Sequence, residues 1–186
     1  MSIKHLKVIV TALSLAASAS LFASATANTG HGEEAEHGAA SGLDFGQPGK
    51  VSAVTRTVNI NMFDNYYDVE SVDVKEGETI RFKITNKAAL VHEFNIAPPE
   101  AHKNHQKEML MMLKHGVIQG NKLNRKLMSM KMANGESMTH NDPNSVLLEP
   151  GESTEIIWKF DDKTQIEFAC NIPGHYQSGM VGKINF

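Results

Sequence analysis

The sequence predicts an all-β domain, a β-sandwich or a barrel, that carries a mainly helical insertion rich in methionine and histidine. Two observations predict the β domain: short runs of residues alternate between apolar and polar side chains, and turns containing glycine or proline separate these runs. A third observation predicts the insertion, because residues 98–145 lose this alternation and adopt helical spacing.

The N-terminal residues have the order of a secretory signal peptide. Lys4 and Lys7 are followed by an uncharged stretch from Val8 to Ala19, and Ala25-Thr26-Ala27 has the small-x-small pattern of a cleavage site. The apolar stretch is too short to span a bilayer stably, although an uncleaved N-terminal anchor is the alternative. We therefore expect residues 1–27 to be removed on export, which makes the protein periplasmic and leaves no membrane span.

The next segment, residues 28–50, is predicted to be a flexible tail. It is rich in Gly, Ala, Ser and Glu and has too few large apolar side chains to pack. His31 and His37 in this tail could bind metal weakly, but a solvated linker is the simpler interpretation. Removing residues 1–27 loses two lysines and no acids, so the formal net charge changes from −3 to −5. This mildly acidic chain has no basic stripe, so we expect no nucleic-acid partner.

The expected strands begin after the tail and are bounded by turn residues. In chain order they contain Val54 to Met62, Val72 to Val74, Ile80 to Ile84, His92 to Ile96, Val146 to Leu148, Ile156 to Phe160, Ile166 to Cys170 and Val181 to Phe186. The turns Glu76-Gly77-Glu78 and Pro150-Gly151-Glu152 each precede a strand. Strands this short and this regularly interrupted are typical of a sandwich or a barrel.

Two helices are expected in the insertion. Pro98-Pro99 opens it, residues 100–115 have helical spacing, and Gly116 is a plausible helix stop. Residues 121–132 are predicted to form the second helix, with Leu123, Leu127 and Met130 on one face.

The strongest chemical signal is the segment that runs from Cys170 to Met180. Cys170 is the single cysteine, so it is a free thiol, an intermolecular link or a metal ligand. The segment reads Cys-Asn-Ile-Pro-Gly-His-Tyr-Gln-Ser-Gly-Met, which places a thiolate, the imidazole of His175 and a thioether on one loop between two strands. Sulfur ligands suit Cu(I) and imidazole suits Cu(II), so such a set serves both oxidation states.

His92 is the natural partner for this loop. It shares its parity with Phe94 and Ile96, so its side chain points to the face that these residues bury. By itself it would be a core histidine; beside the Cys170 loop it becomes a candidate ligand.

The loop and the His92 region together resemble the cupredoxins, the type 1 copper proteins. The Cys-x4-His-x4-Met pattern has Pro-Gly before its histidine and Gly before its methionine, with a spacing similar to that of rusticyanin-like members. The run from Val74 to Asn86, followed by His92-Glu93-Phe94, resembles the family's first-histidine region. The resemblance covers residues 51–97 and 146–186. It implies a Greek-key β-sandwich over residues 51–186, with the insertion at about 98–145. It also implies one copper ion, whose ligands would be His92, Cys170, His175 and Met180.

The insertion resembles that of periplasmic cupredoxins associated with bacterial copper resistance. Seven of the ten methionines lie between Met109 and Met138, and thioethers bind Cu(I). Candidates for a second, weaker Cu(I) site are His102, His105, Met109, Met112, Met128, Met130 and Met132. The alternative is ordinary packing, because methionine fills irregular cores well.

We therefore expect a copper-binding protein that contributes to periplasmic copper tolerance, with a redox or copper-transfer protein as a possible partner. A cupredoxin that transfers electrons to a cytochrome or reductase is the alternative, since the ligand set would be the same. We do not expect an enzyme: multicopper oxidases and copper nitrite reductases need further histidines, often in His-x-His pairs, and this sequence has no such pair.

Overall fold

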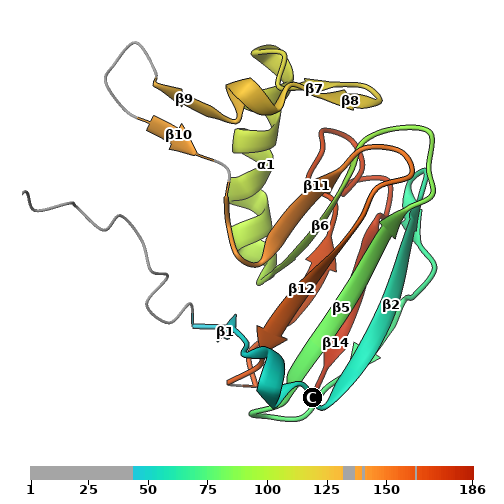
Figure 1. The fold of residues 1–186 in the computed structure, drawn as a ribbon, viewed down its shortest axis with the longest axis vertical. Helices are drawn as coiled ribbons and strands as arrows, with labels where there is room; N and C mark the ends of the chain where they lie inside the picture. Colours follow the sequence, from blue (N-terminus) through green and yellow to red (C-terminus); the bar gives the residue numbers. More distant parts are fainter. Residues whose placement is uncertain (1–43, 132–136, 140, 162) are drawn as a thin grey trace, which may run out of the picture. The chain divides into compact units, whose positions relative to one another are not determined.

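Most of the described chain is built from two five-stranded β-sheets that pack against each other (Figure 1). The structure, a computed structural model, describes residues 44–131, 137–139, 141–161 and 163–186. The predicted signal peptide (1–27) and most of the predicted tail lie outside these residues. The two sheets confirm the predicted all-β Greek-key sandwich.

The first sheet has the strand order β1-β12-β5-β2-β3, and the second has the order β11-β6-β13-β14-β4. The strands of the first are β1 (Gln47–Pro48), β2 (Arg56–Phe63), β3 (Tyr66–Tyr67), β5 (Thr79–Asn86) and β12 (Ser153–Lys159). The strands of the second are β4 (Ser71–Asp73), β6 (His92–Ala97), β11 (Ser145–Leu148), β13 (Ile166–Ala169) and β14 (Val181–Asn185). Within these two sheets, β2–β5 and β14–β4 are parallel and the other pairs are antiparallel.

The alternation of side chains along β5 shows how the sheets join. Phe82 and Ile84 are fully buried, whereas Lys83 between them is exposed. The Phe82 ring meets Phe94 of the facing sheet with ring centroids 5.5 Å apart, and Phe94 in turn lies 5.4 Å from Phe168. Burying each such ring contributes about 1.5–3 kcal/mol, so this aromatic contact is a main source of stability between the sheets.

A glycine keeps β13 and β14 close together. Gly182 of β14 pairs with Phe168 of β13, and a Cβ at Gly182 would lie 2.0 Å from Cζ of the phenylalanine ring. Only glycine therefore lets this ring lie over the neighbouring strand. These two strands flank the segment from Cys170 to Met180, so their close approach holds both ends of that loop.

The predicted flexible tail extends too far, because its last residues belong to the sandwich. Gln47 and Pro48 form β1 and pair with β12. Phe45 is buried and stacks on Trp158 with ring centroids 5.7 Å apart. The Phe45 side chain helps to anchor this segment to the core. The composition of residues 28–50 as a whole is mostly polar and small, so it does not reveal the effect of this one aromatic residue.

Helix α1 (Pro99–Lys114) confirms the first helix predicted in the insertion. Its start follows Pro98, whose extended backbone precedes the helix, and a proline at the first helical position loses no intrahelical hydrogen bond. It ends at His115 and Gly116, and Gly116 adopts the left-handed conformation with φ of +73°.

The second predicted helix, residues 121–132, is wrong. The segment instead contains β7 (Ile118–Gln119), β8 (Lys122–Leu123), a 3-10 turn (Arg125–Leu127) and β9 (Ser129–Lys131), which pairs with β10 (Ser137–Thr139). Gly120, with φ of +67°, turns the chain between β7 and β8. Glu149 then accepts a 2.9 Å hydrogen bond from the Leu123 N–H, and Glu152 pairs with Arg125. These contacts with a distant part of the chain outweigh the helical propensity of the segment.

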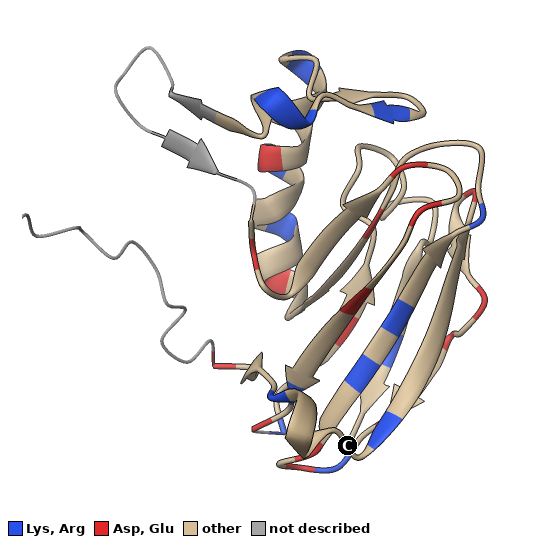
Figure 2. Ribbon diagram, in the orientation of Figure 1, with Lys and Arg blue, Asp and Glu red and all other residues tan. Residues whose placement is uncertain are grey.

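One face of α1 packs against the sandwich. His102, Met109 and Met112 on this face are buried, and the helix lies beside β13 and β7. Its outer face carries charges of both signs, which Figure 2 shows along α1 as well as on the strands. No helix among the described residues is both long and apolar enough to cross a lipid bilayer.

Candidate metal centre

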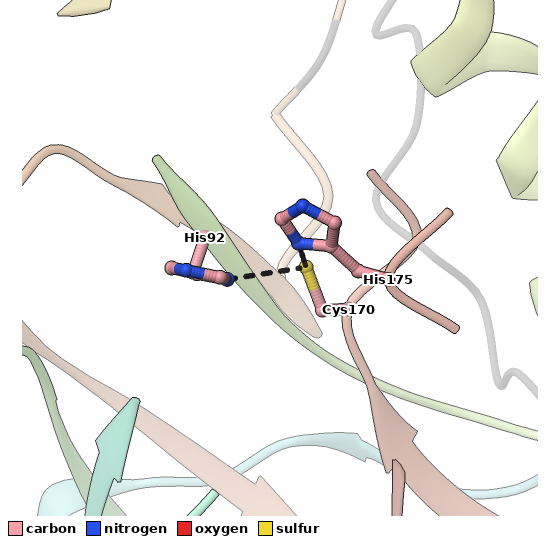
Figure 3. A group of neighbouring side chains, drawn as sticks. All are labelled: His92, Cys170 and His175. Carbon is pink, nitrogen blue, oxygen red and sulfur yellow. Dashed lines mark hydrogen bonds between the residues drawn. The ribbon is translucent and has the colours of Figure 1, made fainter. Parts of the chain in front are cut away.

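The side chains of His92, Cys170 and His175 meet at one end of the second sheet (Figure 3), although His92 lies 78 residues before Cys170 in the chain. The Cys170 Sγ lies 3.3 Å from Nδ1 of His175 and 3.9 Å from Nδ1 of His92. Among the described residues, this is the one group of three or more His, Cys, Asp or Glu side chains whose ligand atoms all lie within 4.8 Å of one another. Three of the four ligands predicted from the sequence are therefore brought together by the fold.

The spacing and chemistry of these donor atoms fit a copper ion. Imidazole and thiolate donors lie about 2.0–2.3 Å from a bound transition-metal ion, so two donors in one trigonal plane are about 3.5–4 Å apart. The observed 3.3 and 3.9 Å are close to that range. Two imidazoles and one thiolate in a plane, with a weak axial thioether, are the donor set of type 1 copper sites.

Backbone hydrogen bonds fold the Cys170–Met180 loop back on itself. The Cys170 N–H donates to the Met180 carbonyl at 3.1 Å, and the Met180 N–H donates to the His175 carbonyl at 3.0 Å. Gly174 and Gly179 have φ of +93° and +96°, values that other residues rarely adopt. These hydrogen bonds and turns present the cysteine and the histidine of the loop toward the same point.

His92 is oriented by an acidic residue on a neighbouring turn. Its Nε2 lies 3.3 Å from Oδ1 of Asp64, which belongs to the turn between β2 and β3. If Nε2 carries the proton and donates it to Asp64, Nδ1 is left with its lone pair facing Cys170. Burial lowers the pKa of His92, and Asp64 opposes this shift in part. The neutral imidazole, which is the form that binds metal, is favoured.

His175 is similarly prepared but less enclosed. Burial lowers its pKa, and the neighbouring His92 lowers it further. Its side chain is half-buried, whereas His92 is completely buried. His175 therefore lies between the buried centre and the outer surface of the loop.

Cys170 is a fully buried thiol whose sulfur accepts the backbone N–H of Glu93 at 3.4 Å. Burial raises its pKa to about 12, and the Glu93 carboxylate adds to this shift. Without metal the thiol keeps its proton at neutral pH, so binding of a cation must release that proton.

Met180, the fourth predicted ligand, is fully buried at the end of the loop, directly before β14. Its carbonyl accepts the Cys170 N–H, which places the two residues side by side in the backbone. Its role as an axial ligand stays a prediction.

The residues predicted for a second Cu(I) site lie in three different settings. His102, Met109 and Met112 are buried on the inner face of α1, and His105 lies beside them and is largely covered. Met128 packs in part against the core. Met130 lies in β9 opposite Met138, and Met132 is outside the described residues.

Both histidines on α1 use their ring nitrogens within the protein. Those of His102 lie 3.1 Å from the Asn171 amide and 3.4 Å from the Glu167 carbonyl. Those of His105 lie 2.8 Å from Glu93 and 3.1 Å from Glu108. Copper binding by this set stays a prediction.

Sequence reasoning missed three polar residues that surround the centre: Asp64, Glu93 and Asn171. Glu93 had a usable signal, since an acid directly after a candidate ligand, in a strand of otherwise apolar or amide residues, has no ordinary place in a core. Asp64 and Asn171 stand in turns, where such residues are common, so nothing distinguishes them in the sequence.

The fold and this donor set together define a cupredoxin. Residues 53–186 match the family described as copper binding proteins, plastocyanin/azurin family, and the chain belongs to it. Copper is therefore the cofactor of this fold and site. Auracyanin B shares the fold with a TM-score of 0.54 and 14% sequence identity, over 76% of this chain and 95% of that one.

Relatives that are more similar in sequence carry the name copper-resistant cuproprotein CopI. The copper-resistant cuproprotein CopI of Pseudomonas aeruginosa is 42% identical over 160 residues, which is 82% of this chain and 88% of that protein. The protein of the same name in Rubrivivax gelatinosus is 34% identical and covers 89% of this chain and 90% of its own length. A third, in Vibrio cholerae, is 25% identical over 143 residues.

Proposed function

We propose that this protein is an exported copper-binding cupredoxin that contributes to periplasmic copper tolerance. The observation that carries the proposal is the convergence of His92, Cys170 and His175 at one buried point. The relatives named copper-resistant cuproproteins support the physiological role, since they match most of this chain. The positive and apolar N-terminus with its small-x-small site supports export.

The residues that would hold the copper ion are His92, Cys170, His175 and Met180. Burial favours the neutral form of the two imidazoles, and backbone hydrogen bonds of the loop fix Cys170 beside them. Cys170 gives up its proton on binding, and the Glu93 N–H then donates to the thiolate. Copper in such a site supplies a one-electron couple. We propose no enzymatic activity, because the further copper centres of multicopper oxidases and copper nitrite reductases need more histidines, often in His-x-His pairs, and the sequence has no such pair.

Electron transfer to a protein partner is the second candidate function. It is favoured by the position of His175, which is half-buried and directly follows Pro173 and Gly174 at the wall of a surface groove. The other residues that line this groove are Lys103, Gln106, Lys107, Leu110 and Gln177. A partner seated there would lie near one ligand. The same site serves both functions, so growth experiments must separate them.

The test is copper tolerance of a strain that lacks the gene and carries it back as wild type or as Cys170→Ser. We expect wild type to restore growth at high copper and Cys170→Ser to fail at equal periplasmic levels. Ser52→Ala, a change at an exposed serine outside the metal-binding loop, is the control and should restore growth. If deletion leaves copper tolerance unchanged but slows respiration in copper-limited medium, electron transfer replaces the proposed role.

A further inference from the structure

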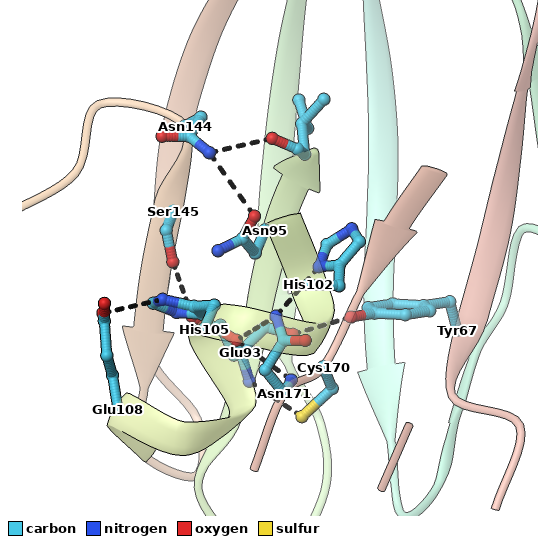
Figure 4. A network of polar contacts seen from close by, with 11 residues as sticks. Tyr67, Glu93, Asn95, His102, His105, Glu108, Asn144, Ser145, Cys170 and Asn171 are labelled. Carbon is cyan, nitrogen blue, oxygen red and sulfur yellow. Dashed lines mark hydrogen bonds and ion pairs between the residues drawn. The ribbon is translucent and has the colours of Figure 1, made fainter. Parts of the chain in front are cut away.

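The insertion helix reaches the residues that stand next to two of the copper ligands (Figure 4). Glu93 directly follows His92, and Asn171 directly follows Cys170. His105 contacts the first of these neighbours and His102 the second. Both histidines belong to α1, so the insertion and the metal centre share one polar network.

Glu93 is the centre of this network. Its side chain is completely buried, and its Oε2 accepts the Asn171 N–H at 3.0 Å and the Asn171 side-chain amide at 2.9 Å. Its Oε1 accepts the Ser145 hydroxyl at 2.6 Å and faces Nε2 of His105 at 2.8 Å. One carboxylate thus joins β6, β11, the cysteine loop and α1.

The backbone of Glu93 contacts the thiol itself. Its N–H donates to the Cys170 Sγ at 3.4 Å, while its carbonyl accepts the hydroxyl of buried Tyr67 at 2.7 Å. Any change in the position of Glu93 therefore moves a hydrogen-bond donor to the sulfur. The Glu93 side chain and the N–H that contacts the sulfur belong to the same residue, so contacts that fix the side chain also help to fix this donor.

His102 supports the other side of the loop. The Asn171 side-chain amide donates to Nδ1 of His102 at 3.1 Å, which leaves Nε2 to donate to the Glu167 carbonyl of β13 at 3.4 Å. β13 leads directly into Cys170. His102 thus braces both the strand before the cysteine and the residue after it.

Helix α1 supplies a charged partner to the buried Glu93 side chain. A buried polar side chain is costly unless hydrogen bonds and charged partners compensate it. Burial lowers the pKa of His105, but the contact with Glu93 outweighs this and raises the pKa to about 9, so the imidazole is positively charged at neutral pH. Helix α1 therefore places a charged hydrogen-bond donor against Glu93, beside the centre.

We propose that His105 is a positioning residue of the copper centre, and that helix α1 acts through it, by way of Glu93, on the geometry around Cys170. This inference rests on the copper ligation proposed above. It gives the insertion a role in the electronic properties of the centre, separate from any copper that its own methionines bind. A network that only stabilised the fold would leave those properties unchanged.

The experiment compares the purified exported protein with three variants, each loaded with one equivalent of Cu(II). His105→Ala removes the contact, His105→Gln keeps a donor to Glu93 without the charge, and His115→Ala is the control at the exposed end of the same helix. We expect His105→Ala to shift the thiolate-to-copper absorption and to release copper to a chelator at least about tenfold faster. His105→Gln should restore most of the absorption, and His115→Ala should match wild type.

The reduction potential gives an independent readout. Glu93→Gln keeps an oxygen for the Asn171 N–H but replaces the carboxylate that His105 contacts, and so disturbs the residue whose N–H donates to the Cys170 Sγ. We expect the ratio of the Cu(II) and Cu(I) affinities to change about tenfold, which shifts the potential by about 59 mV for one electron. If His105→Ala fails to fold, this variant carries the test alone.

The proposal is overturned if His105→Ala and Glu93→Gln lower the melting temperature but keep the absorption, potential and copper release of wild type. Failure of the proposed function is seen separately, because wild type itself would then lack the thiolate-to-copper band. In that case the reaction of the Cys170 thiol with a small alkylating reagent, in metal-free protein, decides the inference. His105→Ala should react about tenfold faster than His115→Ala, and equal rates would refute the positioning role.

Discussion

The Cys170–Met180 loop and the inner face of α1 both carry histidine and methionine within a span of ten residues, yet the fold uses them differently. In the loop, Cys170 and His175 are five residues apart and their donor atoms lie 3.3 Å from each other. On the helix, His102 and Met112 are ten residues apart. At a rise of 1.5 Å per residue they are separated by about 15 Å along the axis.

This difference shows that side chains on one face of a helix need not converge on a single point. A helix sets its side chains in a row, so its inner face packs along the sandwich and its histidines bind neighbouring polar groups one by one. A loop with left-handed glycines reverses direction, as at Gly174 and Gly179, and brings separate donors together. We infer that the loop provides the metal ligands and the helix provides their support.

The largest expected effect comes from removing the thiol. Cys170→Ser should abolish the thiolate-to-copper absorption completely, because no other thiol is present in the chain. The serine hydroxyl can still accept the Glu93 N–H, so we expect a loss of stability of only about 1–3 kcal/mol. Visible and circular dichroism spectra of the copper-loaded and metal-free protein would check both statements. Retention of the colour would refute the ligand assignment.

The next effect tests whether the methionines of α1 pack or bind copper. Met109 is fully buried, so Met109→Ala should lower the free energy of unfolding by about 2–5 kcal/mol. Met109→Leu keeps the side-chain volume and should lower it by less than about 1.5 kcal/mol. Leu110→Ala on the outer face, where the side chain is 40% exposed, is the control and should cost less than Met109→Ala. Urea denaturation measures these differences.

Copper stoichiometry completes that comparison. If Met109 only packs, Met109→Leu binds as many equivalents of Cu(I) as wild type in competition with a Cu(I) chelator. If Met109→Leu stays stable but loses an equivalent, α1 provides ligands as well as support, and the contrast between loop and helix fails.

The smallest effect is a difference in how stability depends on pH. In the metal-free protein, His105 and the other three buried or half-buried histidines contribute with opposite sign. The pKa of His105 in the folded protein is raised to about 9. Its contribution to the free energy of unfolding is therefore complete below the unfolded pKa of about 6.5 and is lost as pH rises toward 9. Burial lowers the pKa of His92, His102 and His175, so their contribution is complete above about 6.5 and is lost as pH falls.

Urea denaturation between pH 6.5 and 7.5 measures the contribution of His105 to stability below the pKa of an unfolded cysteine thiol, about 8.5. Stability should fall with rising pH by up to about 1.4 kcal/mol per unit in wild type, and His105→Ala should remove this slope. His115→Ala should keep it. An equal slope in wild type and His105→Ala would mean that the Glu93–His105 pair carries no charge in the folded protein.

Much of the β framework follows from the sequence alone. The alternation at Phe82 and Ile84 has the period of a strand, and the turn at Gly77 is set by its immediate neighbours. The Cys170–Met180 loop was recognisable for the same reason, since its residues, spacing and glycines are contiguous in the chain. Local patterns of this kind depend on backbone geometry that any fold must respect.

Other features were decided only by contacts between distant residues. The segment from residue 121 onward forms short strands because Glu149 and Glu152 bind it from elsewhere in the chain, and Phe45 joins the core because Trp158 receives it. The partners of Glu93 lie between 12 and 78 residues away along the chain. A buried carboxylate is tolerable only when these groups meet it together, and that meeting exists only in the folded protein.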